Sequence, residues 1–467
     1  MRRDNWQTIA QLLGESLRNT ACPSDHCFYS IDRVVRYVDI LNGSSLAGQR
    51  DQFTGRSVLI HTNGQLAAAI ALIELDGRAR RMILATPDVH GENLSAIIEE
   101  AEVDAVITDH ESPETSHIDL RVRCSPSLIP APKGETVAHR TEWILLTSGT
   151  TGTPKLVIHT LKSLTAAIGA SSGPEEPITW ATFYDIRRYG GLQFYLRAVL
   201  AARSLVLSDK DEALEAHLTR LNAQGATHIT GTPSHWRRVL WSPLAKSITP
   251  SYVRMSGEIV DQAIIDNLRA TYPGVPIGHA YAATEAGVGF TVNDCLEGFP
   301  AEFIDNTRNG VTMKIVDGSL RIRSPGLAAG YLGHKNVMVL DDEGFLDTGD
   351  LIERRGDRCY FMGRKGGIIN VGGLKVYPEE VEAVINRHPD VRISRVRGKK
   401  NPIVGFIVTA DVVVAADNTP GQETDRIKRE ITELCRKELA LHKVPAAVNF
   451  VSSLPVTSGG KLVRANA

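Results

Sequence analysis

The chain has 467 residues, of which 42% are hydrophobic, 23% charged and 6% aromatic, so it can bury a large core and is neither disordered nor fibrous. The 52 Lys and Arg residues nearly balance the 54 Asp and Glu residues, and the formal net charge of -2 excludes a protein dedicated to nucleic-acid binding. The length favours about three units of roughly 150 residues, or one large domain with a smaller partner.

Neither the apolar runs nor the cysteines indicate a membrane or an oxidising compartment. The longest early apolar run, 66–73, is far shorter than the roughly 20 residues that span a bilayer. The 6 cysteines are scattered and show neither the spacing of a zinc site nor a disulfide framework. We therefore expect a cytosolic protein with no membrane partner and no nucleic-acid partner.

The first two thirds of the chain alternate between predicted strands and predicted helices. The strands are expected over 57–60, 105–107 and 227–230, and the helices over 93–101, 212–224 and 259–270. This alternation is typical of βα units and a largely parallel sheet. The sequence therefore predicts an α/β fold with layered βα sheets.

The pattern changes after about residue 310. Strands at 314–316 and 319–322, separated by Asp317-Gly318, predict a hairpin and an antiparallel, β-barrel-like subdomain. Adjacent glycines at 366–367 then precede a short α+β tail with helices over 379–386 and 422–441. We therefore predict a large domain over 1–363 and a small, mobile α+β domain over 364–467, with a hinge near Gly366.

A predicted strand over 142–146 leads into a loop suited to phosphate. The loop reads Thr147, Ser148, Gly149, Thr150, Thr151, Gly152, Thr153, Pro154 and Lys155. Backbone N–H groups and hydroxyls can converge on an anion there, while the lysine supplies charge. Pro154 breaks the spacing of a P-loop, and a solvated Gly/Thr hairpin is the alternative interpretation.

This loop resembles the phosphate-binding signature of adenylate-forming enzymes, which include acyl-CoA synthetases, aryl-acid ligases, luciferases and peptide-synthetase adenylation domains. Further matching segments follow in the family's order: YAATE at 281–285, TGD at 348–350, GR at 363–364 with GGLKVYPEEVE at 372–382, and LPVTSGGKLVR at 454–464. The resemblance covers about 140–464. It implies ATP-dependent activation of a small carboxylic acid as acyl-AMP, followed by thioester formation with CoA or with the phosphopantetheine of a carrier protein.

The resemblance also implies roles for individual residues. Lys461 would be catalytic, because its ammonium can touch both the attacking carboxylate and the α-phosphate. Thr284 would face the α-phosphate, and Glu285 would help to hold Mg²⁺. The implied nucleotide contacts are Thr147, Ser148, Gly149, Thr150, Thr151, Gly152, Lys155, Gly257, Glu258, Tyr281 against adenine, Asp350 with its two acceptor oxygens for the ribose, and Arg364.

Rotation of the small domain would separate the two half-reactions. Gly366 stands where the family commonly has an aspartate or a lysine, so rotation is allowed but a side-chain contact at the hinge is absent. Gly372 and Gly373 would leave room for a narrow thiol arm. A simple β-turn is the alternative interpretation of these two glycines.

The acyl pocket is expected from the order of the segments, and it lacks the family's common histidine. Asp185 lies close to where amino-acid-activating members pair an aspartate with the substrate ammonium. Alternatively, Arg187 and Arg188 would neutralise Asp185, or bind a second acid group of the substrate. The predicted pocket residues are Tyr184, Asp185, Arg187, Gly190, Gly191, His235, His279 and Ala280.

Two alternatives to the acid–thiol ligase stay open from the sequence. One is amino-acid adenylation for loading a carrier protein. The other is a nucleotide-binding scaffold with little turnover, against which Lys461, Glu285 and Asp350 argue.

Overall fold

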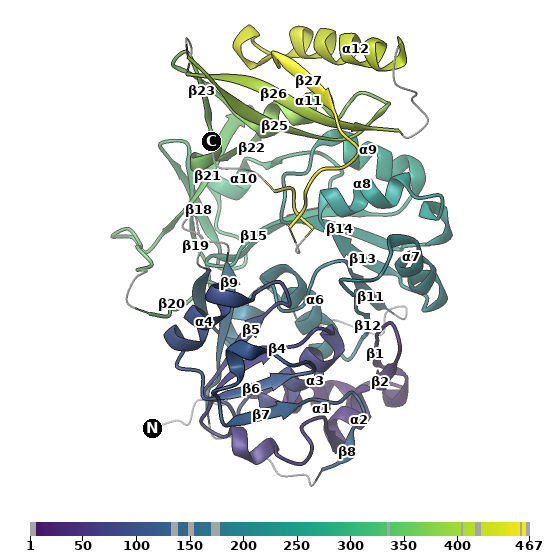
Figure 1. The fold of residues 1–467 in the computed structure, drawn as a ribbon, viewed down its shortest axis with the longest axis vertical. Helices are drawn as coiled ribbons and strands as arrows, with labels where there is room; N and C mark the ends of the chain where they lie inside the picture. The colour runs from purple at the N-terminus through teal and green to yellow at the C-terminus, as the bar shows by residue number, and fades with distance from the viewer. Residues whose placement is uncertain are drawn as a thin grey trace.

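The structure, a computed structural model, describes residues 6–131, 139–147, 154–169, 178–333, 337–402, 405–415, 422–457 and 460–463. Figure 1 shows an elongated molecule in which the small domain, with α11, α12 and β23 to β27, lies at one end of the large domain. The C-terminal segment runs back from the small domain toward α8 and β14 of the large domain. The predicted mixed α/β fold is therefore confirmed.

The first sheet of the large domain is mainly parallel. Its strand order is β20 (Gly330–Tyr331), β10 (Lys155–Thr160), β9 (Glu142–Thr147), β5 (Arg81–Ala85), β4 (Ser57–His61), β6 (Ala105–Thr108) and β7 (Leu120–Arg123). Strands β9, β5, β4, β6 and β7 run parallel, whereas β10 and β20 are antiparallel to their neighbours. The predicted strands at 57–60 and 105–107 are confirmed, and the predicted helix at 93–101 lies within α4 (Gly91–Glu100) but for its last residue.

The second sheet is parallel at its centre and ends in an antiparallel hairpin. Its order is β16 (Gly287–Val292), β15 (Ile277–Ala283), β14 (Tyr252–Ser256), β13 (His228–Gly231), β11 (Thr179–Thr182), β12 (Ser204–Val206), β1 (Cys27–Tyr29) and β2 (Val34–Arg36). Helices α7 (Leu214–Ala223), α8 (Pro233–Trp241) and α9 (Gln262–Thr271) belong to this half. The predicted helices near 212–224 and 259–270 are confirmed with shifted ends, because α9 starts only after Asp261 caps the Ile264 N–H.

Two buried helices join the sheets into one core. Every residue of α3 (Gln65–Leu75) is buried, which is the pattern of a helix covered on all sides. In α6 (Tyr189–Leu200), Tyr195 donates to the Ala69 carbonyl of α3, while Phe194 packs on Trp180 of β11. Helices α1 (Ile9–Arg18), α2 (Tyr37–Asn42) and α5 (Leu161–Thr165) and the pair β3 (Gly43–Ser44) with β8 (Ile129–Pro130) complete this part.

An antiparallel sheet links the two domains. Its order is β17 (Phe299–Pro300), β22 (Arg358–Arg364), β21 (Leu346–Arg355), β19 (Ser319–Arg323) and β18 (Thr312–Val316), with the short helix α10 (Glu302–Asp305) beside β18. Asp317 and Gly318 both have positive φ in the predicted hairpin, as its two-residue turn requires. Within the described part of the chain the end strands β17 and β18 pair with no further strand, so the expected barrel-like subdomain is an open sheet.

The small domain packs two helices on a mixed sheet. The strands are β24 (Leu374–Val376), β23 (Ile369–Val371), β26 (Gly405–Val414), β25 (Val391–Asn401) and β27 (Ala447–Phe450). The helices are α11 (Pro378–Ile385) and α12 (Gln422–Glu438), so the predicted second helix is correct except that its end lies three residues earlier. Their apolar faces form a separate core that includes Ile385, Val412 and Ile431.

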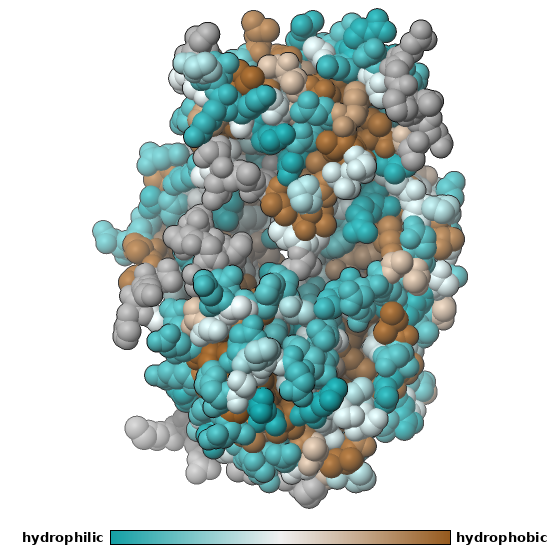
Figure 2. Space-filling view, viewed as in Figure 1, coloured by the Kyte–Doolittle hydropathy of each residue, from teal (hydrophilic) through white to brown (hydrophobic). Residues whose placement is uncertain are grey.

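The surface shows scattered rather than continuous apolar groups. On the face shown in Figure 2, hydrophobic residues form small groups among hydrophilic ones. Among the residues that the structure describes, no helix is both long and apolar enough to cross a membrane. The cytosolic location stays a prediction.

Candidate active site

Strands β9 and β10 hold the two ends of the predicted phosphate loop together. Thr147 and Lys155 are paired residues in this antiparallel ladder, so the loop between them connects a hairpin. Ser148, Gly149, Thr150, Thr151 and Gly152 lie outside the described residues. Lys155 Nζ lies 5.1 Å from the centre of the Tyr331 ring.

Tyr331 joins the loop to the predicted metal ligand, Glu285. The Tyr331 hydroxyl donates to Glu285 Oε1 at 3.1 Å, and burial together with the Glu285 charge raises the pKa of Tyr331 to about 12. Tyr331 could not be predicted as a site residue, because the Gly330-Tyr331 pair belongs to no motif and reaches the site only through the pairing of β20 with β10. Lys155, Tyr331 and Glu285 thus form one polar cluster beside the loop.

Thr284 is fixed through its backbone by a buried histidine. His159 donates from Nε2 to the Thr284 carbonyl at 2.7 Å, and its Nδ1 lies 3.0 Å from Ser163 Oγ. Burial lowers the pKa of His159 to about 4, so the ring is neutral at pH 7. His159 was also missed, since its partner is 125 positions away in the chain.

Asp350, predicted to bind ribose, is held by two donors, one on β15 of the second sheet and one on β22, the partner strand of β21. The Tyr281 hydroxyl donates to Asp350 Oδ2 at 2.7 Å, and Arg364 Nε lies 3.1 Å from Oδ1, as expected for residues paired across β21 and β22. The Tyr281 ring stacks on Phe361 at 4.9 Å, so aromatic packing fixes its position. Each carboxylate oxygen keeps further acceptor capacity for a sugar hydroxyl.

Lys461 reaches this group of residues from the small domain. A Cβ placed on Gly257 would lie 3.0 Å from Lys461 Cε and 3.6 Å from Nζ, so the amine lies directly over this glycine. Although Lys461 keeps accessible surface, burial of the amine lowers its pKa; the nearby Glu258 carboxylate opposes this shift. Asp350 and Arg364 also act electrostatically on Lys461, so the lysine and the predicted ribose site lie together.

Glu258, predicted as a nucleotide contact, accepts three hydrogen bonds from protein groups. Its Oε2 accepts from the Ser234 N–H at 3.0 Å, and its Oε1 accepts from Ser234 Oγ at 3.0 Å and from the Leu462 N–H at 2.9 Å. Ser234 lies in the first turn of α8, and Leu462 belongs to the small domain. The carboxylate therefore connects the two domains next to Lys461.

The pair Asp185 and Arg187 resolves an alternative that the sequence left open. Arg187 Nε lies 2.8 Å from Asp185 Oδ1, and its Nη2 lies 2.5 Å from Oδ2. Arg187 is 2% exposed and also donates to the Thr62 carbonyl and hydroxyl. The Asp185 carboxylate is thus paired with Arg187 and is not an unpaired acceptor for a substrate ammonium.

The other predicted pocket residues fall into two groups. Tyr184 donates to the Ser256 carbonyl at 2.9 Å, Ala280 pairs with Ser256, and His235 stacks on Phe183 at 5.4 Å, all near Gly257. His279 is engaged elsewhere, because its Nε2 lies 2.9 Å from the Leu296 carbonyl.

Gly190 and Gly191 open helix α6 with different constraints. A Cβ on Gly191 would lie 2.1 Å from the Asp185 carbonyl oxygen, whereas a Cβ on Gly190 would meet only the Tyr184 ring at 3.8 Å. Gly191 is therefore required for a close backbone contact, which is a packing role that the pocket prediction did not include.

Arg254 under α6 and Arg197 on α6 have no carboxylate partner among the residues that the structure describes. Arg254 on β14 is 9% exposed, lies 5.6 Å from the Phe194 ring and donates to Thr291 Oγ1 at 2.9 Å. Burial and the neighbouring Arg254 charge lower the pKa of Arg197 on α6 to about 10, so Arg197 stays charged at pH 7, and burial also lowers the pKa of Arg254. Within the described ranges, neither guanidinium lies within ion-pair distance of a carboxylate, and Arg254 Nε has no hydrogen-bond partner.

The hinge glycines lie in short local structures. Gly366 is in a 3-10 turn, Lys365–Gly367, directly after β22. Gly372 and Gly373 have φ of 57° and 87° and connect β23 to β24, so in this orientation the β-turn interpretation describes them.

A cavity of about 520 Å³ lies beside the phosphate loop. Lys155, Tyr331, Gly349 and Lys365 line one part of it, and residues 337–341 line another. The lysines in its lining suit the phosphate end of a nucleotide.

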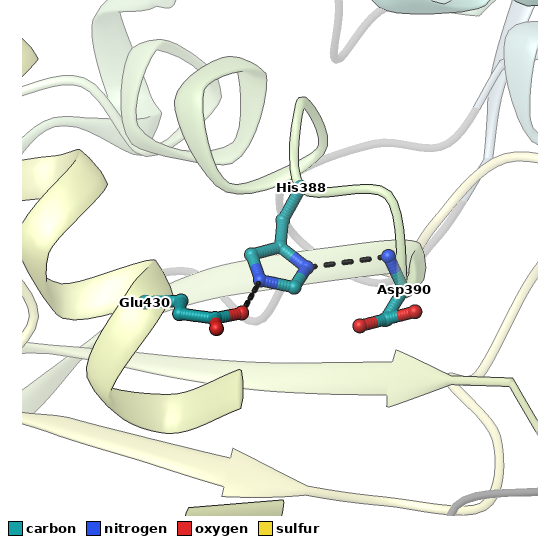
Figure 3. A group of neighbouring side chains, drawn as sticks. All are labelled: His388, Asp390 and Glu430. Carbon is teal, nitrogen blue, oxygen red and sulfur yellow. Dashed lines mark hydrogen bonds and ion pairs between the residues drawn. The ribbon is translucent and has the colours of Figure 1, made fainter. Parts of the chain in front are cut away.

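A second polar cluster lies in the small domain, away from Lys461. Figure 3 shows His388 between Glu430, which it contacts at 2.9 Å, and the Asp390 backbone N–H, which approaches its other ring nitrogen at 3.2 Å. Arg426 pairs with both carboxylates. Since both ring nitrogens are engaged and the acids are neutralised, this cluster is an ion-pair network rather than a metal site.

Comparisons with known proteins give matches over most of the chain. The family description "AMP-binding enzyme" matches residues 64–332, and "AMP-binding enzyme C-terminal domain" matches residues 380–461. A 2-succinylbenzoate--CoA ligase of Bacillus mycoides is 26% identical over 400 residues, covering 80% of each chain. A 4-coumarate--CoA ligase-like protein of Arabidopsis thaliana is 25% identical over 412 residues, covering 78% of this chain and 71% of the relative.

Solved structures share the fold along almost the whole chain. The o-succinylbenzoate CoA synthetase of Bacillus subtilis, in complex with an acyl-adenylate intermediate, has a TM-score of 0.74 at 19% identity and covers 97% of this chain and 96% of its own. The amide bond synthetase McbA of Marinactinospora thermotolerans has a TM-score of 0.76 at 21% identity, with 97% and 98% coverage.

Proposed function

Because the chain belongs to the AMP-binding enzyme family, we propose that its site residues activate a carboxylic acid bearing a second acid group and transfer the acyl group to CoA. The reaction class itself is that of the relatives: this chain is an adenylate-forming ligase that makes an acyl-AMP and then a thioester. The observation that supports the assigned residue roles is the position of Lys461 over Gly257, beside Asp350 and Arg364.

The first half-reaction needs positive charge where two anions meet. A carboxylate and a triphosphate repel by about 1 kcal/mol per charge pair in water and more in a drier site. The Lys461 ammonium would contact both reacting groups, and Lys155 would contact the outer phosphates. Loss of one preorganised donor of this kind costs roughly 3 to 4 kcal/mol, so Lys461→Ala is expected to reduce adenylation by at least 100-fold.

The residues near Glu285 suit Mg²⁺. One Glu285 oxygen accepts from Tyr331, and the carboxylate, nearby hydroxyls and phosphate oxygens are the hard ligands that this ion prefers. When bound, the ion would neutralise phosphate charge. Tyr331 would orient the Glu285 carboxylate, and His159 would hold the adjoining Thr284 backbone in place.

The proposed acid class is supported by Arg254 under α6 and Arg197 on α6. Arg254 lies two residues before Ser256 on the same face of β14, and Gly257, which contacts Lys461, follows Ser256. Arg254 is thus three residues before the glycine that lies beside Lys461, and its charge acts on Arg197 of α6. Two charged guanidiniums without a carboxylate are costly unless an anion pairs with them, so a second acid group on the substrate fits them.

An amino-acid substrate is less well supported. The carboxylate that would bind its ammonium, Asp185, is paired with Arg187. For the acceptor we favour CoA over a carrier protein, because the relatives that match most of the chain are CoA ligases.

ATP–pyrophosphate exchange tests the acid class with a matched pair of substrates. 2-Succinylbenzoate and 4-oxo-4-phenylbutanoate differ only by one carboxyl group, and we expect exchange to favour the diacid at least 10-fold. Arg254→Met and Arg197→Met should remove this preference, whereas Arg269→Met, at an exposed position of α9, should keep it. Equal exchange with both acids, or greater exchange with amino acids, would contradict the proposal. Adding CoA or a pantetheinylated carrier then identifies the acceptor.

A further inference from the structure

The contact between the C-terminal hairpin and the large domain has its own geometry. We use the name C-terminal hairpin for the described residues 456–457 and 460–463, which Val456 and Leu462 close by a β-bridge. The Thr457 N–H donates to the Lys461 carbonyl at 2.7 Å, which fixes the backbone that supports the lysine. Two hydrogen bonds then join this hairpin to the large domain, from Leu462 N–H to Glu258 and from Thr232 Oγ1 to the Gly460 carbonyl at 2.9 Å.

These two bonds flank Lys461 on both sides. Gly460 and Leu462 are its immediate neighbours, so the two contacts fix the backbone on either side of the lysine. Glu258 is itself fixed by two donors from Ser234, one of which is a backbone N–H in the first turn of α8. A carboxylate at a helix N-terminus is favourably placed, so Glu258 is a rigid acceptor for the Leu462 N–H.

Gly460 fits closely against the large domain. Its φ is 70°, and a Cβ there would lie 1.9 Å from His235 Cε1 and 2.1 Å from Nε2. The His235 ring is in turn fixed, because its Nδ1 accepts from the Thr232 N–H at 3.1 Å. Only glycine therefore allows the C-terminal hairpin to approach this ring.

We propose that Glu258 is a positioning residue that holds the C-terminal hairpin, and with it Lys461, in the orientation for adenylation. The hydrogen bond from Thr232 and the close packing of Gly460 against His235 contribute to the same contact. The proposal rests on the proposed role of Lys461. It gives Glu258 a role besides the expected nucleotide contact, because the Glu258 oxygens accept from Ser234 and Leu462. Breaking the contact releases the lysine for the second half-reaction.

Measuring the two half-reactions separately tests this role. Glu258→Ala is expected to reduce the kcat of ATP–pyrophosphate exchange roughly 10- to 100-fold, the effect of losing a hydrogen bond to a charged group, with little change in the KM for ATP. CoA thioester formation from supplied succinylbenzoyl-adenylate should keep at least half its rate. Glu258→Gln, which keeps an acceptor for the Leu462 N–H, should restore most exchange, and Glu433→Ala, exposed on α12, is the control.

The glycine gives an independent test with a compensating change. Gly460→Ala should abolish exchange and spare the thioester step, because its methyl group meets His235. Adding His235→Ala to this variant removes the ring. The exchange rate of the double variant should be at least 10-fold higher than that of Gly460→Ala alone. No recovery would show that Gly460 acts other than through His235 and would overturn this part of the proposal.

The contact between the small domain and the large domain can also be measured without any acid substrate. Arg392 of β25 lies 4.7 Å from the ring of Trp241, the last residue of α8, so this indole reports contact between the domains. The Trp241 signal, obtained by subtracting the spectrum of Trp241→Phe, should shift to longer wavelength in Glu258→Ala and Gly460→Ala. An unchanged signal, or equal losses in both half-reactions, would overturn the proposal. If Lys461→Ala keeps full exchange, the proposed function fails instead, whatever the Trp241 signal shows.

Discussion

Replacing Asp185 by asparagine tests whether the Asp185–Arg187 pair is structural. Arg187 has 1% of its side chain exposed and Asp185 15%, so the pair is almost fully withdrawn from water. Removing one charge leaves the other buried and unpaired, which costs about 3 to 5 kcal/mol. At about 2.1 cal/mol/K per residue, the large domain has an unfolding entropy of about 0.8 kcal/mol/K, so its Tm should fall by about 4 to 6 °C.

Thermal unfolding of Asp185→Asn, followed by calorimetry or circular dichroism, measures this loss. The double variant Asp185→Asn with Arg187→Met should recover most of it, because no unpaired charge is left. Asp305→Asn is a matched control, because Asp305 and its partner Arg354 are both half exposed and water screens such a pair, so its loss should leave the Tm nearly unchanged. If Asp185 were unpaired and bound a substrate ammonium, Asp185→Asn would raise the Tm. An increase in Tm would therefore refute the internal pair.

Three further predictions concern packing and pH. Gly191→Ala should prevent folding or cost several kcal/mol, because the new methyl group meets the Asp185 backbone at 2.1 Å, whereas Gly190→Ala should be stable; soluble yield and Tm measure both. The His159 contribution to the free energy of unfolding should fall by up to about 3 kcal/mol as pH drops from about 6.5 to about 4, since His159 gains a proton in the unfolded chain but not in the folded one. His159→Gln should flatten this part of the stability curve, and an unchanged slope would contradict the assigned burial. Because burial lowers the pKa of Lys461, adenylation should lose rate as pH rises through a value below 10.5, while thioester formation from a supplied adenylate should not lose rate there.

Local patterns were sufficient to predict the architecture, because hydrophobic periodicity and turn residues act over short distances. The hairpin around Asp317-Gly318 is correct since those two residues alone favour its turn. Helix ends are less accurate: α9 begins after Asp261 because that side chain caps Ile264, a choice among several polar residues that the sequence does not decide.

Contacts between distant segments could not be predicted from one sequence. Arg254 and Arg197 act on each other only because α6 packs on β14, and neither residue stands in a motif. Glu258 was assigned to the nucleotide by its place near matched segments, yet it accepts from Leu462, 204 positions away. For Asp185, the spacing to Arg187 allowed both pairing and substrate binding, and only the side-chain geometry selects pairing.

The Asp350 carboxylate is in contact with two protein side chains, Tyr281 and Arg364, when no nucleotide is bound. When a nucleotide lacks one ribose hydroxyl, the Asp350 carboxylate therefore still has hydrogen-bond donors. The free-energy cost of an unpaired polar group, which makes polar pockets selective, is small here. We expect this ligase to tolerate 2′-deoxy-ATP better than an enzyme whose aspartate depends on the ribose for its hydrogen bonds. This tolerance is due to the residues that contact Asp350 and not to Asp350 itself.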